Sequence, residues 1–195
     1  MSDALAALGR WASDQSLNYQ AVSGRVQINT LDNPGWSLKV ALGGTAMASR
    51  TLQPIEINRT EADWCHCFTR DGQFMAFGGA RNLGEAIGRF IAWANQLPAP
   101  SNDPSLDIVR LQDWYAGNCD GEWEHASGVR IQTTPGSTWS IVINLQDTKL
   151  ENAADPRAPA RTENRHYLVT CGAEKLGLAI RDFLDWSDRS SGSAT

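Results

Sequence analysis

The sequence predicts an α+β fold made of two tandem homologous domains, each an antiparallel sheet with an N-terminal and a C-terminal helix. The first observation is a repeat, because 8 of the 35 residues from Trp11 to Thr45 recur unchanged 103 positions later. The second is a shared ending, because LGEAIGRFIAW up to Trp93 matches LGLAIRDFLDW up to Trp186 at a spacing of 93. One copy is as long as a small domain, which indicates a tandem duplication rather than a solenoid. The predicted domains are residues 1–97 and 103–188.

Each half is expected to begin with an amphipathic helix. Leu5, Leu8 and Trp11 share one helical face, and the second half repeats this pattern from Ile108 onward. Asp103-Pro104 would open the second helix, as an N-cap followed by a proline at the first helical position.

Strands follow the first helix in both halves. Alternating apolar residues predict a hairpin of residues 26–30 and 38–42, and its twin lies at residues 129–133 and 141–145. A third strand, Ile55-x-Ile57, is visible only in the first half.

The next elements differ between the halves. In the first half two β segments flank Asp71-Gly72, a dipeptide that suits a tight hairpin turn. The second half offers a single β run, HYLVTC, and is ten residues shorter between Thr148 and Leu176. The loss of a whole strand and the shortening of a hairpin both fit this difference.

A helix closes each half, with apolar residues at i, i+4, i+7 and i+8 from Leu83 and again from Leu176. Asn82 is placed to cap the first of these helices, with Glu85 three residues further on. The order helix, strands, helix excludes a parallel βαβ sheet, in which strands and helices would alternate.

Composition narrows the class of protein. The chain has 195 residues, of which 42% are hydrophobic, and its apolar runs are too short to span a membrane. A net charge of −5 argues against a nucleic-acid partner, since phosphate binding needs clustered Lys and Arg. Four cysteines do not resemble a secreted disulfide framework, so we expect free thiols and a cytoplasmic location.

Two strings carry a family resemblance, TLDNPGWSLKVALGGT (residues 30–45) and LQDWYAGNCDGEWEHASGVRIQT (residues 111–133). With Asp63-Trp64 and FGGARNLGEAIGRFIAWA (residues 77–94), they resemble small bacterial immunity proteins of polymorphic toxin systems, the family immunity protein fifty-three. The resemblance covers most of the chain. It implies an antitoxin that binds and neutralises one cognate toxin domain by stoichiometric occlusion, with no cofactor and no membrane partner.

The motif CDGEWEH, in the second half only, is the first candidate for the toxin-binding site. As a strand it would place Asp120, Glu122 and Glu124 on one face and Trp123 and His125 on the other. Three carboxylates beside a large aromatic could engage Arg and Lys on a basic toxin. A structural turn that anchors Trp123 and a metal or acid–base cluster are the alternatives.

The competing toxin-binding candidate is peculiar to the first half. Asp32 and Asn33 lie at the expected hairpin tip, where contact residues concentrate, and Trp64 has no counterpart in the second half. We expect Cys65 and Cys67 to point to the same side of a strand as packing residues, because a zinc site would need two further ligands. No metal site is predicted.

Three functions remain open at this point. The first is the immunity protein, which would be a monomer with internal pseudo-symmetry because the second copy takes the place of a dimer partner. The second is an enzyme that uses the CDGEWEH carboxylates or Cys171, as the rhodanese-related label of some family members suggests. However, a rhodanese needs a nucleophilic Cys in an anion-binding loop of a parallel sheet. The third is a structural interaction module.

Overall fold

The computed structural model describes residues 4–18, 25–98, 105–136, 138–153 and 159–191. Asp103-Pro104 lies outside the described residues, as does most of the segment that stands in the first half where CDGEWEH stands in the second. The first repeat contains α1 (Ala4–Asn18), β1 (Val26–Leu31), β2 (Gly35–Ala41), β3 (Ile55–Asn58), β4 (Trp64–Arg70), β5 (Gln73–Gly79) and α2 (Leu83–Asn95). The second contains α3 (Leu106–Asn118), α4 (Trp123–Ala126), β6 (Val129–Thr134), β7 (Thr138–Asn144), β8 (Arg161–Glu163), β9 (His166–Gly172), the 3₁₀ turn η1 (Ala173–Lys175) and α5 (Leu176–Ser191).

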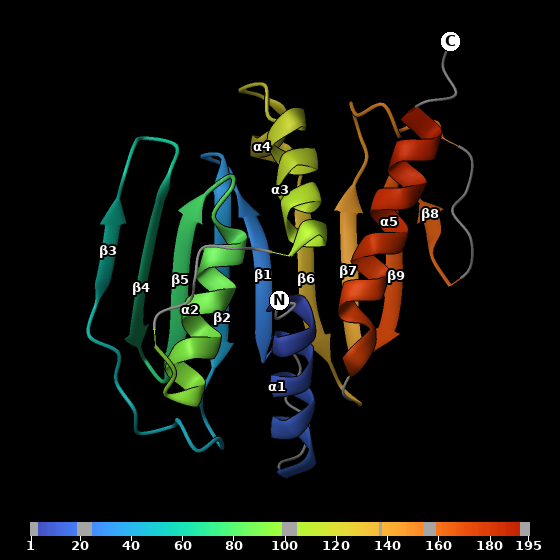
Figure 1. The fold of residues 1–195 in the computed structure, drawn as a ribbon. Coiled ribbons are helices and arrows are strands. Elements are labelled where there is room, and N and C mark those ends of the chain that lie inside the picture. The colour runs from blue at the N-terminus through green and yellow to red at the C-terminus, as the bar shows by residue number, and fades with distance from the viewer. Residues whose placement is uncertain (1–3, 19–24, 99–104, 137, 154–158, 192–195) are drawn as a thin grey trace.

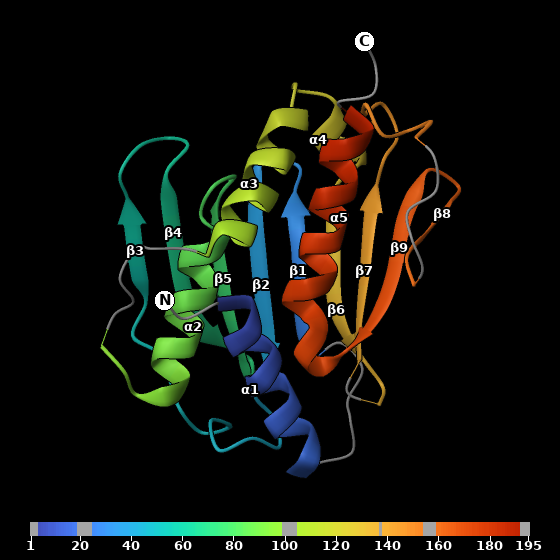
Figure 2. The same ribbon diagram turned by 45° about the vertical axis from the view of Figure 1, so that its right-hand side comes forward.

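The nine strands found in the described residues form one antiparallel sheet in the order β3-β4-β5-β2-β1-β6-β7-β9-β8. The long helices cover a single face of this sheet, with α2 and α5 on the outside and α1 and α3 between them (Figures 1 and 2). The α+β class with a helix at both ends of each repeat is therefore confirmed. We call the sheet face opposite these helices the open face.

The two repeats join through β1 and β6 about a local pseudo-twofold axis. Ile28 pairs with its own repeat counterpart, Ile131, and the flanking pairs are related by the same symmetry. Two reciprocal hydrogen bonds close the junction. The Val26 N–H donates to Thr133 Oγ1 and the Val129 N–H donates to Thr30 Oγ1, both at 3.0 Å. The contact is isologous, as in a symmetric dimer, but both partners belong to one chain.

The tryptophan pairs occupy matching environments in the two repeats. The indole N–H of Trp36 donates to Ala80 O at 2.8 Å, and that of Trp139 donates to Ala173 O at 3.1 Å. The aromatic clusters also match, because equivalent ring pairs have similar separations and angles: Trp11–Phe90 and Trp114–Phe183, Phe74–Phe90 and Tyr167–Phe183, Phe74–Trp93 and Tyr167–Trp186. The shared sequence positions are therefore core positions, as their periodicity predicts.

The ten missing residues correspond to β3 and the turn that follows it. Asn164 and Arg165 form the β8–β9 turn with positive φ, as Asp71 and Gly72 do between β4 and β5 at the same spacing of 93. Strand β8 is therefore a shortened β4, and the second repeat has no counterpart of β3 among its described residues. Both alternatives left open by the sequence are combined, a lost strand and a shortened hairpin.

The N-terminal helix of each repeat packs against the other repeat. Tyr115 of α3 donates its hydroxyl to Leu31 O at 2.9 Å and accepts the Gly35 N–H at 3.2 Å, both in the first repeat. Conversely, Gly9 of α1 approaches the second repeat so closely that a Cβ would lie 2.6 Å from Ala173 O. The repeats share one sheet and one helical layer, so each contributes to the core of the other.

Candidate functional site

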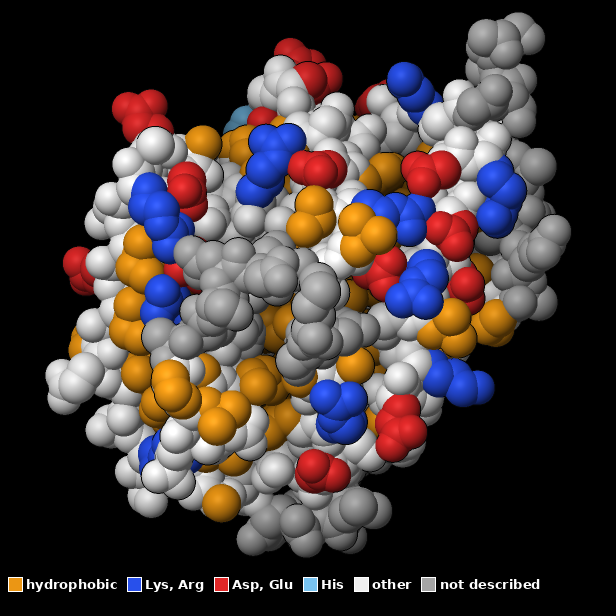
Figure 3. Space-filling model, viewed as in Figure 1, with side chains coloured by type: hydrophobic (Ala, Val, Ile, Leu, Met, Phe, Trp, Pro, Cys, Tyr) orange, Lys and Arg blue, Asp and Glu red, His pale blue; other side chains and the backbone are white. Residues whose placement is uncertain are grey.

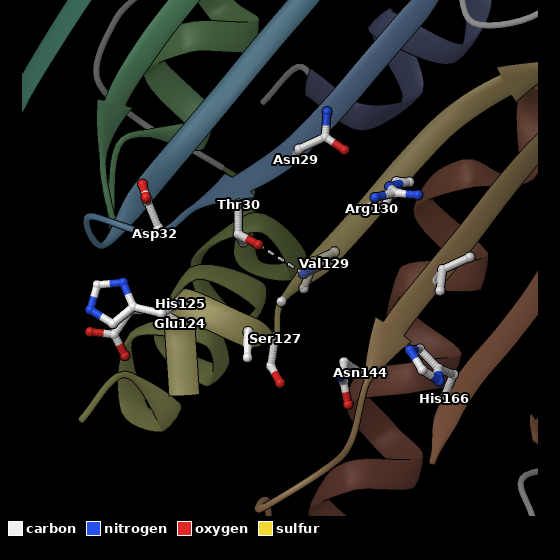
Figure 4. A pocket seen from close by; sticks show the side chains of 13 residues that line it. Asn29, Thr30, Asp32, Glu124, His125, Ser127, Val129, Arg130, Asn144 and His166 are labelled. Atoms are coloured by element: carbon white, nitrogen blue, oxygen red, sulfur yellow. Dashed lines mark hydrogen bonds between the residues drawn. The ribbon is translucent and has the colours of Figure 1, made fainter. Parts of the chain in front are cut away.

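A polar pocket of about 340 Å³ lies where the two repeats meet (Figure 4). The first repeat contributes Asn29, Thr30 and Asp32 from β1 and the hairpin tip. The second contributes the segment from Glu124 to Arg130, together with Val142, Asn144 and His166. The pairing of β1 with β6 therefore creates a site to which both repeats contribute.

The pocket brings together parts of the two candidate surfaces. Asp32 from the hairpin tip of the first repeat and Glu124 and His125 from the CDGEWEH motif all line it. Asn33 is exposed beside Asp32, and Glu122 is exposed just before α4. Trp64 lies apart from the pocket, on β4 near the first edge of the sheet.

The strand arrangement considered for CDGEWEH is wrong, because residues 123–126 form the short helix α4. The Asp120 carboxylate accepts the N–H groups of Glu122 and Trp123 at 3.0 and 2.9 Å. Glu124 reaches back to accept the N–H groups of Asp120 and Gly121. This reciprocal arrangement resembles a capping box and satisfies the free donors of the helix start. Local side-chain hydrogen bonding therefore overrides the alternating pattern.

Hydrogen bonding also fixes the charge of this turn. The backbone N–H groups of Trp123 and Glu122 lower the pKa of Asp120 below its ordinary value. Asp120 is therefore a carboxylate at neutral pH, committed to backbone donors. This geometry makes it a positioning group for the turn rather than a free acid or base.

Trp123 is buried, with 5% of its surface exposed. Its indole N–H donates to Gln146 O at 2.8 Å, and its ring meets Trp114 and Tyr115 at centroid distances of 6.0 and 6.1 Å. The aromatic ring of the motif therefore anchors the turn to the core. Glu122 and His125 are exposed, as is Asp120, whose carboxylate is bonded to the backbone of the turn.

The other side of the pocket is rich in hydrogen-bond donors that the sequence analysis missed. Arg130 lies directly opposite Asn29 across the β1–β6 pair, and Asn144 lies opposite His166 across the β7–β9 pair. His166 Nδ1 lies 2.8 Å from Asn164 O, which makes Nδ1 the proton-bearing nitrogen and leaves Nε2 for another partner. The missing signal was the strand pairing, since no local pattern indicates that β1 and β6 are neighbours.

A family comparison gives the context for this site. The model of the family described as Immunity protein 53 matches residues 5–95 and, a second time, residues 108–188. The chain belongs to the Immunity protein 53 family. It contains the family domain twice, in tandem. Neither the curated proteins nor the solved structures include a match to the chain.

The thiols of this Immunity protein 53 member are packing groups. Cys65 and Cys67 point to the same buried side of β4, as predicted, with their sulfurs 3.8 Å apart. Burial raises the pKa of Cys171 and that of Cys119, so both thiols remain protonated at neutral pH. Within the described residues, no group of three or more His, Cys, Asp or Glu side chains is arranged to hold a metal. No described helix combines the length and apolar character that crossing a membrane requires.

Proposed function

We propose that this protein is an immunity protein that binds one cognate toxin domain and neutralises it by stoichiometric occlusion. The single observation that carries the proposal is the family match, which covers both repeats rather than one. A family of immunity proteins implies a protein partner, the toxin. Occlusion requires a shaped surface and no chemistry of its own.

The toxin-binding residues divide into two roles under this proposal. Asp32, Asn33, Glu122 and His125 are exposed around the pocket and would contact the toxin directly. Three other members of CDGEWEH, namely Asp120, Trp123 and Glu124, hold the turn that presents Glu122 and His125. Trp64 would contact the toxin from β4, on the open face.

The geometry favours binding over catalysis. The Cys171 thiol belongs to the antiparallel strand β9 and its pKa is raised, whereas a rhodanese-type nucleophile needs a lowered pKa. The carboxylates of Asp120 and Glu124 accept backbone N–H groups, so they are not free to act as an acid–base pair. These observations support a protein that acts by binding a partner rather than by catalysis.

Co-expression with the toxin domain encoded beside it tests the proposal. We expect growth to be restored, and the purified pair to form a complex with one copy of each chain by light scattering. The free protein is expected to be monomeric, because its two repeats already satisfy the isologous junction. Restored growth at a small fraction of the toxin concentration, with no complex, would instead indicate an enzyme. Absence of both protection and binding would remove the proposal.

A further inference from the structure

The charges on the sheet are distributed unevenly. No Asp or Glu occurs on the inner strands, which are β4, β5, β2, β1, β6, β7 and β9. The whole chain nevertheless has a net charge of −5. The acidic residues of the strands are Glu56 and Glu163, and both lie on the edge strands β3 and β8. The central part of the sheet is therefore free of negative side chains.

The cationic side chains of these inner strands all belong to the open face. Lys39, Arg70 and Arg130 alternate with the buried residues of their strands, whose side chains face the helices. His66 and His166 share this face for the same reason. In Figure 4 the strands carry Arg130, Asn144 and His166 in front of the helices, which are seen behind the sheet.

The face covered by the helices has a different distribution of charged side chains. Acidic and basic side chains are intermixed there (Figure 3), and many neutralise one another. Arg110 bonds Asp185 and Asp188 at 2.9 and 2.7 Å, and Arg181 bonds Asp107 at 2.8 Å. By contrast, no ion pair involves Lys39 or Arg130 within the described residues.

The open face also carries an aromatic cluster on the first repeat. Phe68 and Phe77 stack at a centroid distance of 6.0 Å, and Trp64 lies 5.1 Å from His66. All four side chains are partly exposed. At the matching positions of the second repeat, Phe68 and Phe77 are replaced by Arg161 and Thr170. The cluster is thus not required by the shared core.

We infer that the open face is the toxin-binding surface, and that the toxin presents to it an acidic surface with an apolar patch to one side. This inference rests on the proposed immunity function. Carboxylates of the toxin would bind Lys39 and Arg130, with Asn29 as a further donor beside Arg130. The apolar part would pack on Phe68 and Phe77, since aromatic residues and Arg are enriched in protein interfaces.

Charge complementarity selects this occupant. A basic toxin would be repelled by Lys39 and Arg130 on the inner strands. The carboxylates that share the pocket with Arg130 are Asp32 and Glu124, and Glu124 already accepts backbone N–H groups. Aromatic residues and cations on a sheet can also bind single-stranded nucleic acid. Three cationic residues spread over seven strands are too few for the phosphate contacts that such binding needs. The observations therefore favour an acidic protein surface.

The test reverses both central charges with the variant Lys39→Glu/Arg130→Glu and measures its affinity for the toxin domain. We expect about 100-fold weaker binding and a loss of protection. The matched control is Arg10→Glu/Lys175→Glu, which changes the net charge equally at two exposed positions of α1 and η1. Its affinity for the toxin should lie within about threefold of that of the natural protein, because salt screens charges that lie away from the interface.

Four outcomes separate the inference from the function on which it rests. Equal affinity of the Lys39/Arg130 variant and the natural protein would overturn the inference alone, as would equal weakening in both variants. Failure of the natural protein to bind the toxin would remove the proposed function itself. Binding of the natural protein to a labelled single-stranded RNA, lost in the Lys39/Arg130 variant, would assign the open face to nucleic acid instead. If Lys39→Glu/Arg130→Glu melts at a lower temperature than the natural protein, the variant Lys39→Gln/Arg130→Gln is measured in its place. We then expect about tenfold weaker binding to the toxin.

Discussion

The two repeats have the same core, but they differ at positions whose side chains the packing of that core does not require. Trp36 and Trp139 make the same backbone hydrogen bond, and the aromatic clusters around Phe90 and Phe183 match ring for ring. Among the described residues, the first repeat has β3 and its turn without a counterpart in the second, and the second has the 3₁₀ turn η1 and a shortened strand β8. Duplication has preserved the folding positions and released the rest to diverge.

One position shows how such divergence follows from a deletion. In the first repeat the turn after β3 supplies Arg59, which bonds Glu85 on α2 at 2.8 Å, and Arg89 bonds the same carboxylate at 2.9 Å. The described part of the second repeat contains no such turn, and the residue matching Glu85 is Leu178, which is 52% exposed. The loss of the covering segment removed the cationic partner and with it the reason for a carboxylate.

The largest expected effect tests whether the two cores are equivalent. We expect Trp36→Ala and Trp139→Ala each to lower the free energy of unfolding by about 3–5 kcal/mol, since both rings are fully buried and well packed. Urea unfolding should show one transition for both variants, because the repeats share one sheet. Two separated transitions, or a loss in one repeat only, would show that the repeats fold independently.

The second prediction concerns α4, which contains part of the motif CDGEWEH of the second repeat. Trp123→Ala should cost about 3 kcal/mol, because the ring is buried against Trp114 and Tyr115. Glu122→Lys, at an exposed neighbouring residue, should change stability by less than about 0.5 kcal/mol while changing the affinity for the toxin. Thermal unfolding of both variants beside binding measurements separates the two roles. A stable Trp123→Ala protein would show that the ring does not anchor the turn.

This motif also shows how far sequence reasoning reaches. Periodic apolar residues predicted the repeat, the helices and most strands, because a buried face imposes its period on the sequence. The alternation in CDGEWEH resembled a strand, but Asp120 and Glu124 bond the nearby backbone and begin a helix instead. The pocket could not be predicted, since Arg130 and Asn29 become neighbours only through the β1–β6 pairing. This pairing joins residues that are about 100 positions apart in the sequence.

A third prediction tests the junction that makes the two repeats one sheet. Thr30→Val and Thr133→Val preserve side-chain shape but leave the N–H groups of Val129 and Val26 without their acceptors. We expect each variant to lose about 1–2 kcal/mol, and the two losses to be similar because the pseudo-twofold axis relates them. Chemical denaturation of the single variants and the double variant measures this. A loss in only one of them would show that the junction is symmetric in geometry but not in energy.

The smallest effect concerns the ion pairs present only in the first repeat. Burial would raise the pKa of Glu85, but hydrogen bonds from Arg59 and Arg89 outweigh it and lower this pKa below 4.5. A carboxylate whose pKa is lower in the folded state stabilises the fold above about pH 4.5, and this contribution is lost as the pH falls through the folded value. Glu85→Gln should therefore cost about 1 kcal/mol at pH 7, with the difference from the natural protein shrinking below pH 4.5. Leu178→Gln, the matched change in the second repeat, should show no such pH dependence in parallel unfolding titrations. A constant Glu85→Gln difference from pH 7 to pH 3 would mean that the two arginines contribute packing rather than charge.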